Sequence, residues 1–85
     1  MSYTLRITQL DAEGFTYKIE LLDVPTDESL PSLLYWTRCI RLREQGGFDI
    51  TEDERHLDVD DESREQFERM TRTLADHQYR AREKP

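Results

Sequence analysis

The sequence has no long hydrophobic run, a single cysteine and no excess of basic residues. No stretch approaches the roughly 20 apolar residues that a membrane-spanning helix requires. The first ten residues alternate polar with apolar, so they lack the continuous apolar run of a signal peptide. Because Cys39 is alone, no disulfide can form within the chain, which fits a reducing cytosol. We therefore expect a cytoplasmic protein.

The charge balance narrows the function classes further. The 85 residues include 19 Asp and Glu against 12 Lys and Arg, for a formal net charge of -7. Direct binding of nucleic acid through a basic face is not expected, because that interaction needs Lys and Arg to displace counterions. Disorder is not expected either, because the chain keeps aromatic residues and apolar periodicity. At this length we expect one domain over residues 1–85.

Two alternating segments open the chain. In residues 3–9 apolar side chains alternate with polar ones, and residues 15–21 repeat this period-two pattern. Such alternation is typical of half-buried strands. Turn-forming residues lie between them at 11–14, so the sequence predicts a β-hairpin. One face of this hairpin is polar: Thr4, Arg6, Thr8, Thr16, Lys18 and Glu20.

The segment after this hairpin is predicted to form a helix. Pro31 is tolerated in a first helical turn because it lacks an N–H group. Arginines lie near the far end, where cations suit the helix dipole, and Gly46 with Gly47 supplies a left-handed stop. We therefore predict a helix from about residue 29 to 45. Its apolar residues recur at helical spacing: Leu30, Leu33, Leu34, Tyr35, Trp36, Cys39, Ile40 and Leu42.

The second half is predicted to repeat this order. Residues 48–51 and 56–59 alternate around a polar bend at 52–55, which predicts a shorter hairpin; the alternative is an acidic loop without a ladder. Asp60, Asp61 and Ser63 can cap a following helix whose inner stripe includes Phe67, Leu74 and His77. Residues 82–85 are expected to fray. The fold class expected is α+β, a two-layer sandwich of order β-β-α-β-β-α with two helices on one face of an antiparallel sheet.

Counting charge by segment locates the acidity. Residues 1–48 have a net charge of -2 and residues 66–85 of +2, whereas residues 49–65 hold nine acidic and two basic residues, a net of -7. Carboxylates held in such a row resemble the phosphates of a nucleic-acid backbone and suit a basic partner. The alternative is a solvated loop and helix start that serve solubility. The candidate partner-binding residues are Asp49, Glu52, Asp53, Glu54, Asp58, Asp60, Asp61 and Glu62.

Catalytic and metal sites are not expected. Asp58, Asp60 and Glu62 match the first positions of a calcium loop, but Ser63 stands where glycine is needed and Arg69 where a bidentate glutamate is needed. Cys39 falls among apolar neighbours, which favours an inert thiol, and nothing brings it together with His56 or His77. No cofactor motif occurs.

Two functions follow as hypotheses. The first is a small non-enzymatic inhibitor whose acidic residues occupy a basic, nucleic-acid-binding surface of a larger partner. Anti-CRISPR proteins and other phage or mobile-element inhibitors share that physical profile, an analogy of type without a sequence match. The second is an adaptor or homodimer that associates through the predicted first helix, or through an open strand edge. Its candidate contact residues are Tyr35, Trp36, Arg38 and Arg41.

Overall fold

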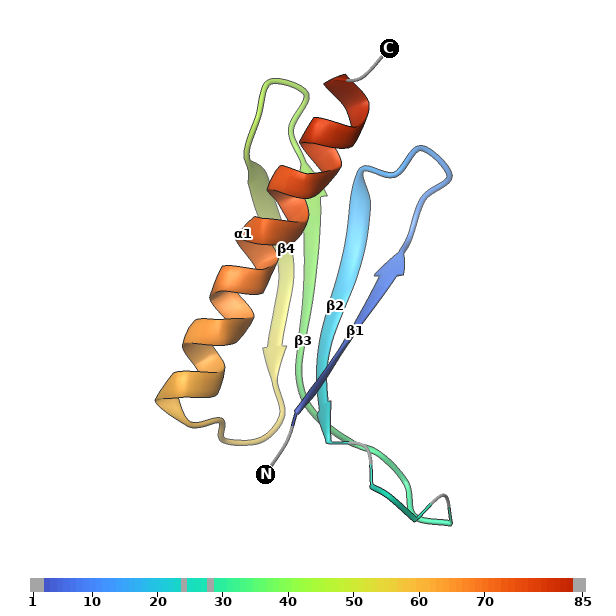
Figure 1. Ribbon diagram of the computed structural model, residues 1–85, viewed down its shortest axis with the longest axis vertical. Coiled ribbons are helices and arrows are strands. Elements are labelled where there is room, and N and C mark those ends of the chain that lie inside the picture. Colours follow the sequence, from blue (N-terminus) through green and yellow to red (C-terminus); the bar gives the residue numbers. More distant parts are fainter. Residues whose placement is uncertain (1–2, 24, 28, 84–85) are drawn as a thin grey trace.

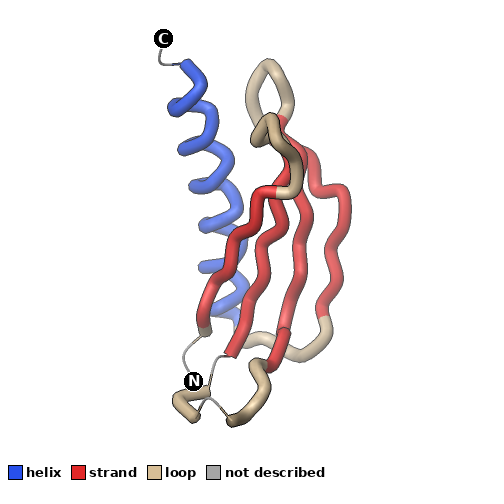
Figure 2. The backbone as a smooth tube through the Cα atoms, turned by 90° about the vertical axis from the view of Figure 1, so that its right-hand side faces the viewer, coloured by secondary structure: helices blue, strands red, loops and turns tan. Residues whose placement is uncertain are grey.

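The computed structural model describes residues 3–23, 25–27 and 29–83. Four strands form one antiparallel sheet, ordered as they occur in the chain: β1 (Thr4–Gln9), β2 (Thr16–Asp23), β3 (Leu33–Leu42) and β4 (Phe48–Arg55). One helix, α1 (Asp61–Glu83), follows and lies across β3 and β4 (Figure 1). The helix covers one side of the sheet, and no described element covers the other (Figure 2).

The predicted order of strands and helices is wrong in its middle. The chain runs β-β-β-β-α, with one helix in place of two. The segment expected to be a helix at 29–45 contains β3, which pairs with β2 on one side and with β4 on the other. A bulge leaves Tyr35 without a partner on β2, so Tyr35 and its neighbour Trp36 are both buried. The apolar residues of β3 therefore do not alternate cleanly and also satisfy a helical template. Aromatic and β-branched residues in this segment favour the strand.

The predicted second hairpin is also wrong. Residues 52–55, expected to form a bend, belong to β4, which pairs with β3 from Leu42↔Phe48 to Trp36↔Arg55. Gly46 and Gly47 have φ angles of 112° and 81°, so they form the turn between β3 and β4. Left-handed glycines serve a tight turn as well as a helix end, and the sequence alone does not separate the two.

The first hairpin and the last helix are confirmed. Asp11 Oδ1 closes the β1–β2 turn by accepting hydrogen bonds from the backbone N–H groups of Gly14 (3.0 Å), Phe15 (2.9 Å) and Thr16 (3.1 Å). These bonds, chiefly that from Thr16, hold the pKa of the Asp11 carboxyl below its usual value. Of the predicted caps, Asp60 serves α1. The helix includes residues 82–83 of the tail expected to fray, and residues 84–85 lie outside the described part.

The core lies between α1 and the sheet. Trp36 and Phe67 are at most 1% exposed, and their rings stack with centroids 4.3 Å apart. Ile19 and Ile40 are equally buried beside them on β2 and β3. This contact joins the middle of the sheet to the helix and fixes where α1 crosses it. Within the described residues, no helix has the length and apolar character to cross a membrane.

Candidate interaction surface

The eight predicted partner-binding acids lie along one margin of the molecule. We call this set the acidic edge: Asp49, Glu52, Asp53, Glu54, Asp58, Asp60, Asp61 and Glu62. It follows β4, the connection at 56–60 and the first turn of α1. Among the strands of the described residues, β4 pairs only with β3, so it is an edge strand of the sheet. Charged side chains are common on edge strands, where they discourage pairing with other chains.

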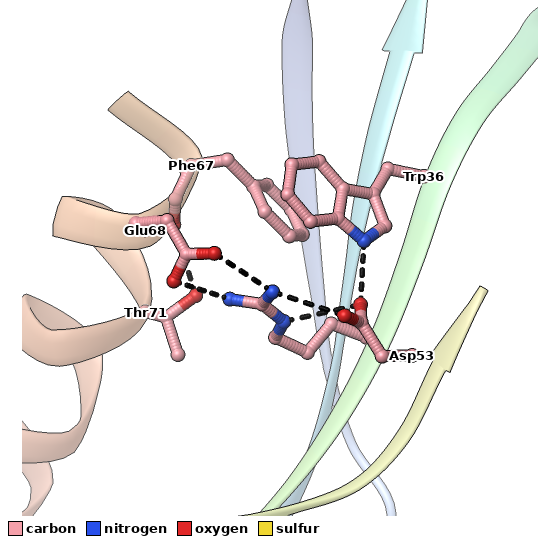
Figure 3. A network of polar contacts seen from close by, with 6 residues as sticks. Trp36, Asp53, Phe67, Glu68 and Thr71 are labelled. Atoms are coloured by element: carbon pink, nitrogen blue, oxygen red, sulfur yellow. Dashed lines mark hydrogen bonds and ion pairs between the residues drawn. The ribbon is translucent and has the colours of Figure 1, made fainter. Parts of the chain in front are cut away.

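Asp53 belongs to this edge by position, but its side chain turns toward the helix. It accepts hydrogen bonds from Trp36 Nε1 at 2.5 Å and from Arg38 Nε at 3.2 Å (Figure 3). Burial alone would raise the pKa of this carboxyl, but the bonds from Arg38 and Trp36 outweigh burial and hold the pKa below its usual value. Asp53 therefore anchors β4 to the core, and both of its carboxylate oxygens are bonded to Trp36 or Arg38, although 40% of the side chain is exposed.

Glu68 completes this network and was not among the predicted site residues. Its carboxylate accepts two bonds from Arg38, at 2.8 Å from Nη1 and 2.9 Å from Nη2. Arg38 is 2% exposed and packs over the Trp36 and Phe67 rings, 4.8 and 5.1 Å from their centroids. One buried guanidinium thus joins β3, β4 and α1. An arginine within an otherwise apolar segment could have indicated this network. The predicted helix at 29–45 placed that arginine at the surface instead.

Two more acids have local structural roles. Asp49 forms an exposed ion pair with Arg43 across the β3–β4 turn, and this pairing lowers the pKa of the Asp49 carboxyl. Asp60 Oδ1 accepts a hydrogen bond from the Ser63 N–H at 2.7 Å, which makes Asp60 the N-cap of α1. The Ser63 bonds lower the pKa of the Asp60 carboxyl. These interactions fix the backbone at both ends of the acidic edge.

The remaining five acids are exposed: Glu52, Glu54, Asp58, Asp61 and Glu62. Across the part of the chain that the structure describes, none of them pairs with a Lys or Arg side chain. Glu54 lies 3.7 Å from His56 Nε2, and the Cys39 thiol lies 3.7 Å from Glu52. The Glu52 and Glu54 side chains lie on the uncovered side of the sheet, since their neighbours across the ladder are Cys39 and Thr37. These five carboxylates are the part of the acidic edge that is available to a partner.

The second predicted contact set does not form a surface. Tyr35, Trp36 and Arg38 are 6%, 1% and 2% exposed, and only Arg41 is open to solvent. Tyr35 and Trp36, although adjacent, are both buried because a bulge in the β2–β3 ladder at Leu21/Leu22 shifts the register between them. Association through a first helix is excluded, because β3 takes its place.

The three residues weighed for catalysis lie apart. Burial raises the pKa of the Cys39 thiol, and the nearby Glu52 carboxylate raises it further. His56 lies in the connection after β4, whereas His77 is exposed on α1 and not on its inner stripe as predicted. Among the residues described, no three His, Cys, Asp or Glu side chains are grouped as metal ligands. Models of known protein families, curated proteins and solved structures all lack a match to this chain.

Proposed function

We propose that this protein is a non-catalytic inhibitor whose acidic edge occupies a basic, nucleic-acid-binding surface of a larger cytoplasmic protein. The observation that supports this proposal is the gathering of Glu52, Glu54, Asp58, Asp61 and Glu62 on one margin, exposed and without Lys or Arg partners in the described structure. An unneutralised patch of one sign steers a partner of opposite charge and selects it.

The spacing of the carboxylates supports a nucleic-acid mimic. A strand rises about 3.4 Å per residue, so same-face side chains such as Glu52 and Glu54 repeat at about 6.8 Å. Successive phosphates of one DNA strand wind around the duplex, so they lie farther apart than their ~3.4 Å rise along the axis. A regular repeat of single negative charges is the feature that Glu52 and Glu54 share with that backbone. Asp58 in the connection and Asp61 and Glu62 in the first turn of α1 add negative charge beyond the end of β4, where the chain passes from the sheet to the helix layer.

The acidic edge is held in place before it meets a partner. Asp53 ties β4 to Trp36 and Arg38, and Asp60 ties the connection to the start of α1. A preorganised surface loses less conformational entropy on binding than a flexible acidic tail does. The single Cys39, buried in the sheet, is consistent with function in a reducing compartment.

The proposal is tested by reversing the charge of exposed acidic residues that have no role in stabilising the fold. Glu52→Lys with Glu54→Lys replaces two exposed carboxylates and spares Asp53. Glu44→Lys with Asp76→Lys makes the same change of charge at two other exposed positions, one in the β3–β4 turn and one in the second half of α1, and leaves the five unpaired carboxylates in place. Each variant and the wild type serve as bait in a host lysate, and captured proteins are quantified by mass spectrometry with and without competing DNA or RNA.

The proposal expects a nucleic-acid-binding protein that the wild type and the control capture and that the Glu52/Glu54 variant loses at least tenfold. Added nucleic acid should displace it, and capture should weaken steeply as salt rises. Equal capture by both double variants would contradict the acidic-edge model. So would capture that neither nucleic acid nor salt affects.

A further inference from the structure

The two free edges of the sheet differ in charge. β4 carries four carboxylates: Asp49, Glu52, Asp53 and Glu54. β1 has no acidic residue, and its single cation, Arg6, is paired with Glu20 through Nε at 2.9 Å. In Figure 1, β1 lies on the side of the sheet farthest from α1. Since β1 pairs only with β2, its outer backbone edge is unpaired within the described structure.

The pattern of hydrogen bonds identifies the groups on that edge. The Leu10 N–H donates to the Thr16 carbonyl at 2.8 Å, so Leu10 faces β2. Antiparallel ladders alternate the direction of the backbone groups from residue to residue. The N–H and C=O groups of Leu5, Ile7 and Gln9 therefore point away from β2, toward open space. They form a row of donors and acceptors ready to pair with another strand.

Apolar side chains accompany these free groups. Ile7 lies opposite the buried Ile19, so its side chain is on the helix side of the sheet, yet it is 43% exposed. Met70, 37% exposed, is two residues from Glu68, whose carboxylate bonds Arg38 on β3, so the two side chains leave α1 on opposite flanks. The helix thus leaves the outer part of β1 uncovered, and apolar surface borders the unpaired backbone.

We propose that the protein forms a homodimer by antiparallel pairing of β1 with β1 of a second copy, about a two-fold axis at Ile7. Ile7 then faces Ile7 of the second copy, and Leu5 faces Gln9. Because these residues carry the outward backbone groups, each facing pair makes both of its ladder bonds. Arg6 faces Thr8, whereas an axis at Arg6 would place two like charges opposite each other, which is unfavourable.

The distribution of charge favours pairing of two copies through β1 over pairing through β4, because β4 holds four carboxylates and β1 holds none. In the eight-stranded sheet the two β4 strands are separated by seven spacings of about 4.8 Å, or about 34 Å. That distance exceeds the Debye length of about 8 Å at physiological ionic strength, so the acidic edges repel each other little. Pairing through β4 would bring the same carboxylates together. The dimer does not depend on the proposed function and leaves both acidic edges exposed.

Sedimentation equilibrium over a range of concentrations tests the dimer. Ile7→Lys places a charge opposite its own copy, and Ile50→Lys makes the same change on β4 at a side chain 48% exposed. We expect the wild type and Ile50→Lys to dimerise with similar constants and Ile7→Lys to weaken the dimer at least tenfold. A wild type that stays monomeric at millimolar concentration overturns the proposal, as does a dimer that Ile7→Lys leaves intact.

A distance measurement tests the same register without altering β1. A nitroxide is attached at Glu54→Cys in a Cys39→Ala background, and pulsed electron paramagnetic resonance reports the distance between copies. Pairing at Ile7 predicts a distribution centred near 35 Å, from seven strand spacings and a two-residue offset. A distance below about 20 Å would mean pairing through β4, and the absence of a dipolar signal would mean no dimer; either result overturns the proposal.

Discussion

Replacing Arg38 with methionine removes the cation that joins the sheet to α1. Arg38 is 2% exposed, and its guanidinium satisfies both Asp53 and Glu68. Removing one partner of a buried ionic network costs about 3–5 kcal/mol, because the remaining charges are left unpaired. Here the two carboxylate side chains are 40% and 43% exposed, so water compensates part of that cost.

We therefore expect Arg38→Met to lower the free energy of unfolding by about 3 kcal/mol. For a domain of this size that corresponds to a fall in Tm of roughly 12–24 °C. Urea unfolding followed by circular dichroism and by fluorescence gives the value, since Trp36 is the only tryptophan and stacks at this point. Arg41→Met, an exposed arginine on the same strand, should stay within about 0.5 kcal/mol of the wild type.

A neutralised network separates lost charge pairing from lost packing. Adding Asp53→Asn and Glu68→Gln to Arg38→Met removes the unpaired carboxylates and keeps an oxygen acceptor for Trp36. This triple variant should regain at least half of the lost stability. The reasoning is refuted if Arg38→Met unfolds like the wild type, or if the triple variant is less stable than Arg38→Met alone.

Three further measurements follow from the same geometry. The folded state holds the pKa of the Asp53 and Glu68 carboxyls below their unfolded values, so the stability they contribute is present above about pH 4.5 and is lost as pH falls through the folded pKa values. Urea midpoints from pH 7 to pH 3 should fall for the wild type and more shallowly for Arg38→Met; parallel curves would contradict this. Phe67→Ala should cost about 3–5 kcal/mol in urea unfolding, since the ring is fully buried; a loss under 1 kcal/mol would mean that the ring is not packed there. In the folded protein the buried Cys39 thiol, whose pKa is raised, should react with a thiol reagent at least tenfold more slowly than in the protein unfolded in urea. Equal rates in the two states would show that the thiol is accessible to solvent.

The sequence predicted those elements whose two faces differ in polarity. β1 and β2 alternate polar with apolar residues, and α1 combines an apolar stripe with charged flanks, so each of these patterns indicated a single type of element. In β3 the bulge at Tyr35 places two adjacent aromatic residues in the core, and the charged Arg38 faces inward with them, which disturbs the alternation that would have identified a strand. β4 is rich in carboxylates, which an edge strand tolerates but which also suit a bend.

The candidate site depended on the same element. Position and charge were enough to find the acidic edge, because Glu52 and Glu54 are exposed in either reading. The sequence did not predict that the Asp53 side chain points inward. That orientation depends on Arg38 lying on the same face of a strand as Trp36 and Ile40. Glu68 was missed for the same reason: its partner lies 30 residues away in the chain.

The order of the sheet has a consequence for how the chain folds. Each strand pairs with the strand next to it in sequence, so the sheet assembles from local hairpins with short loops to close, an arrangement that favours fast folding. The helix comes last along the chain and brings Glu68 and Phe67 to a sheet already formed. If α1 docks after the folding transition state, Arg38→Met will change the unfolding rate far more than the folding rate. The Arg38 network would then slow the unfolding of the native protein and leave its folding rate unchanged.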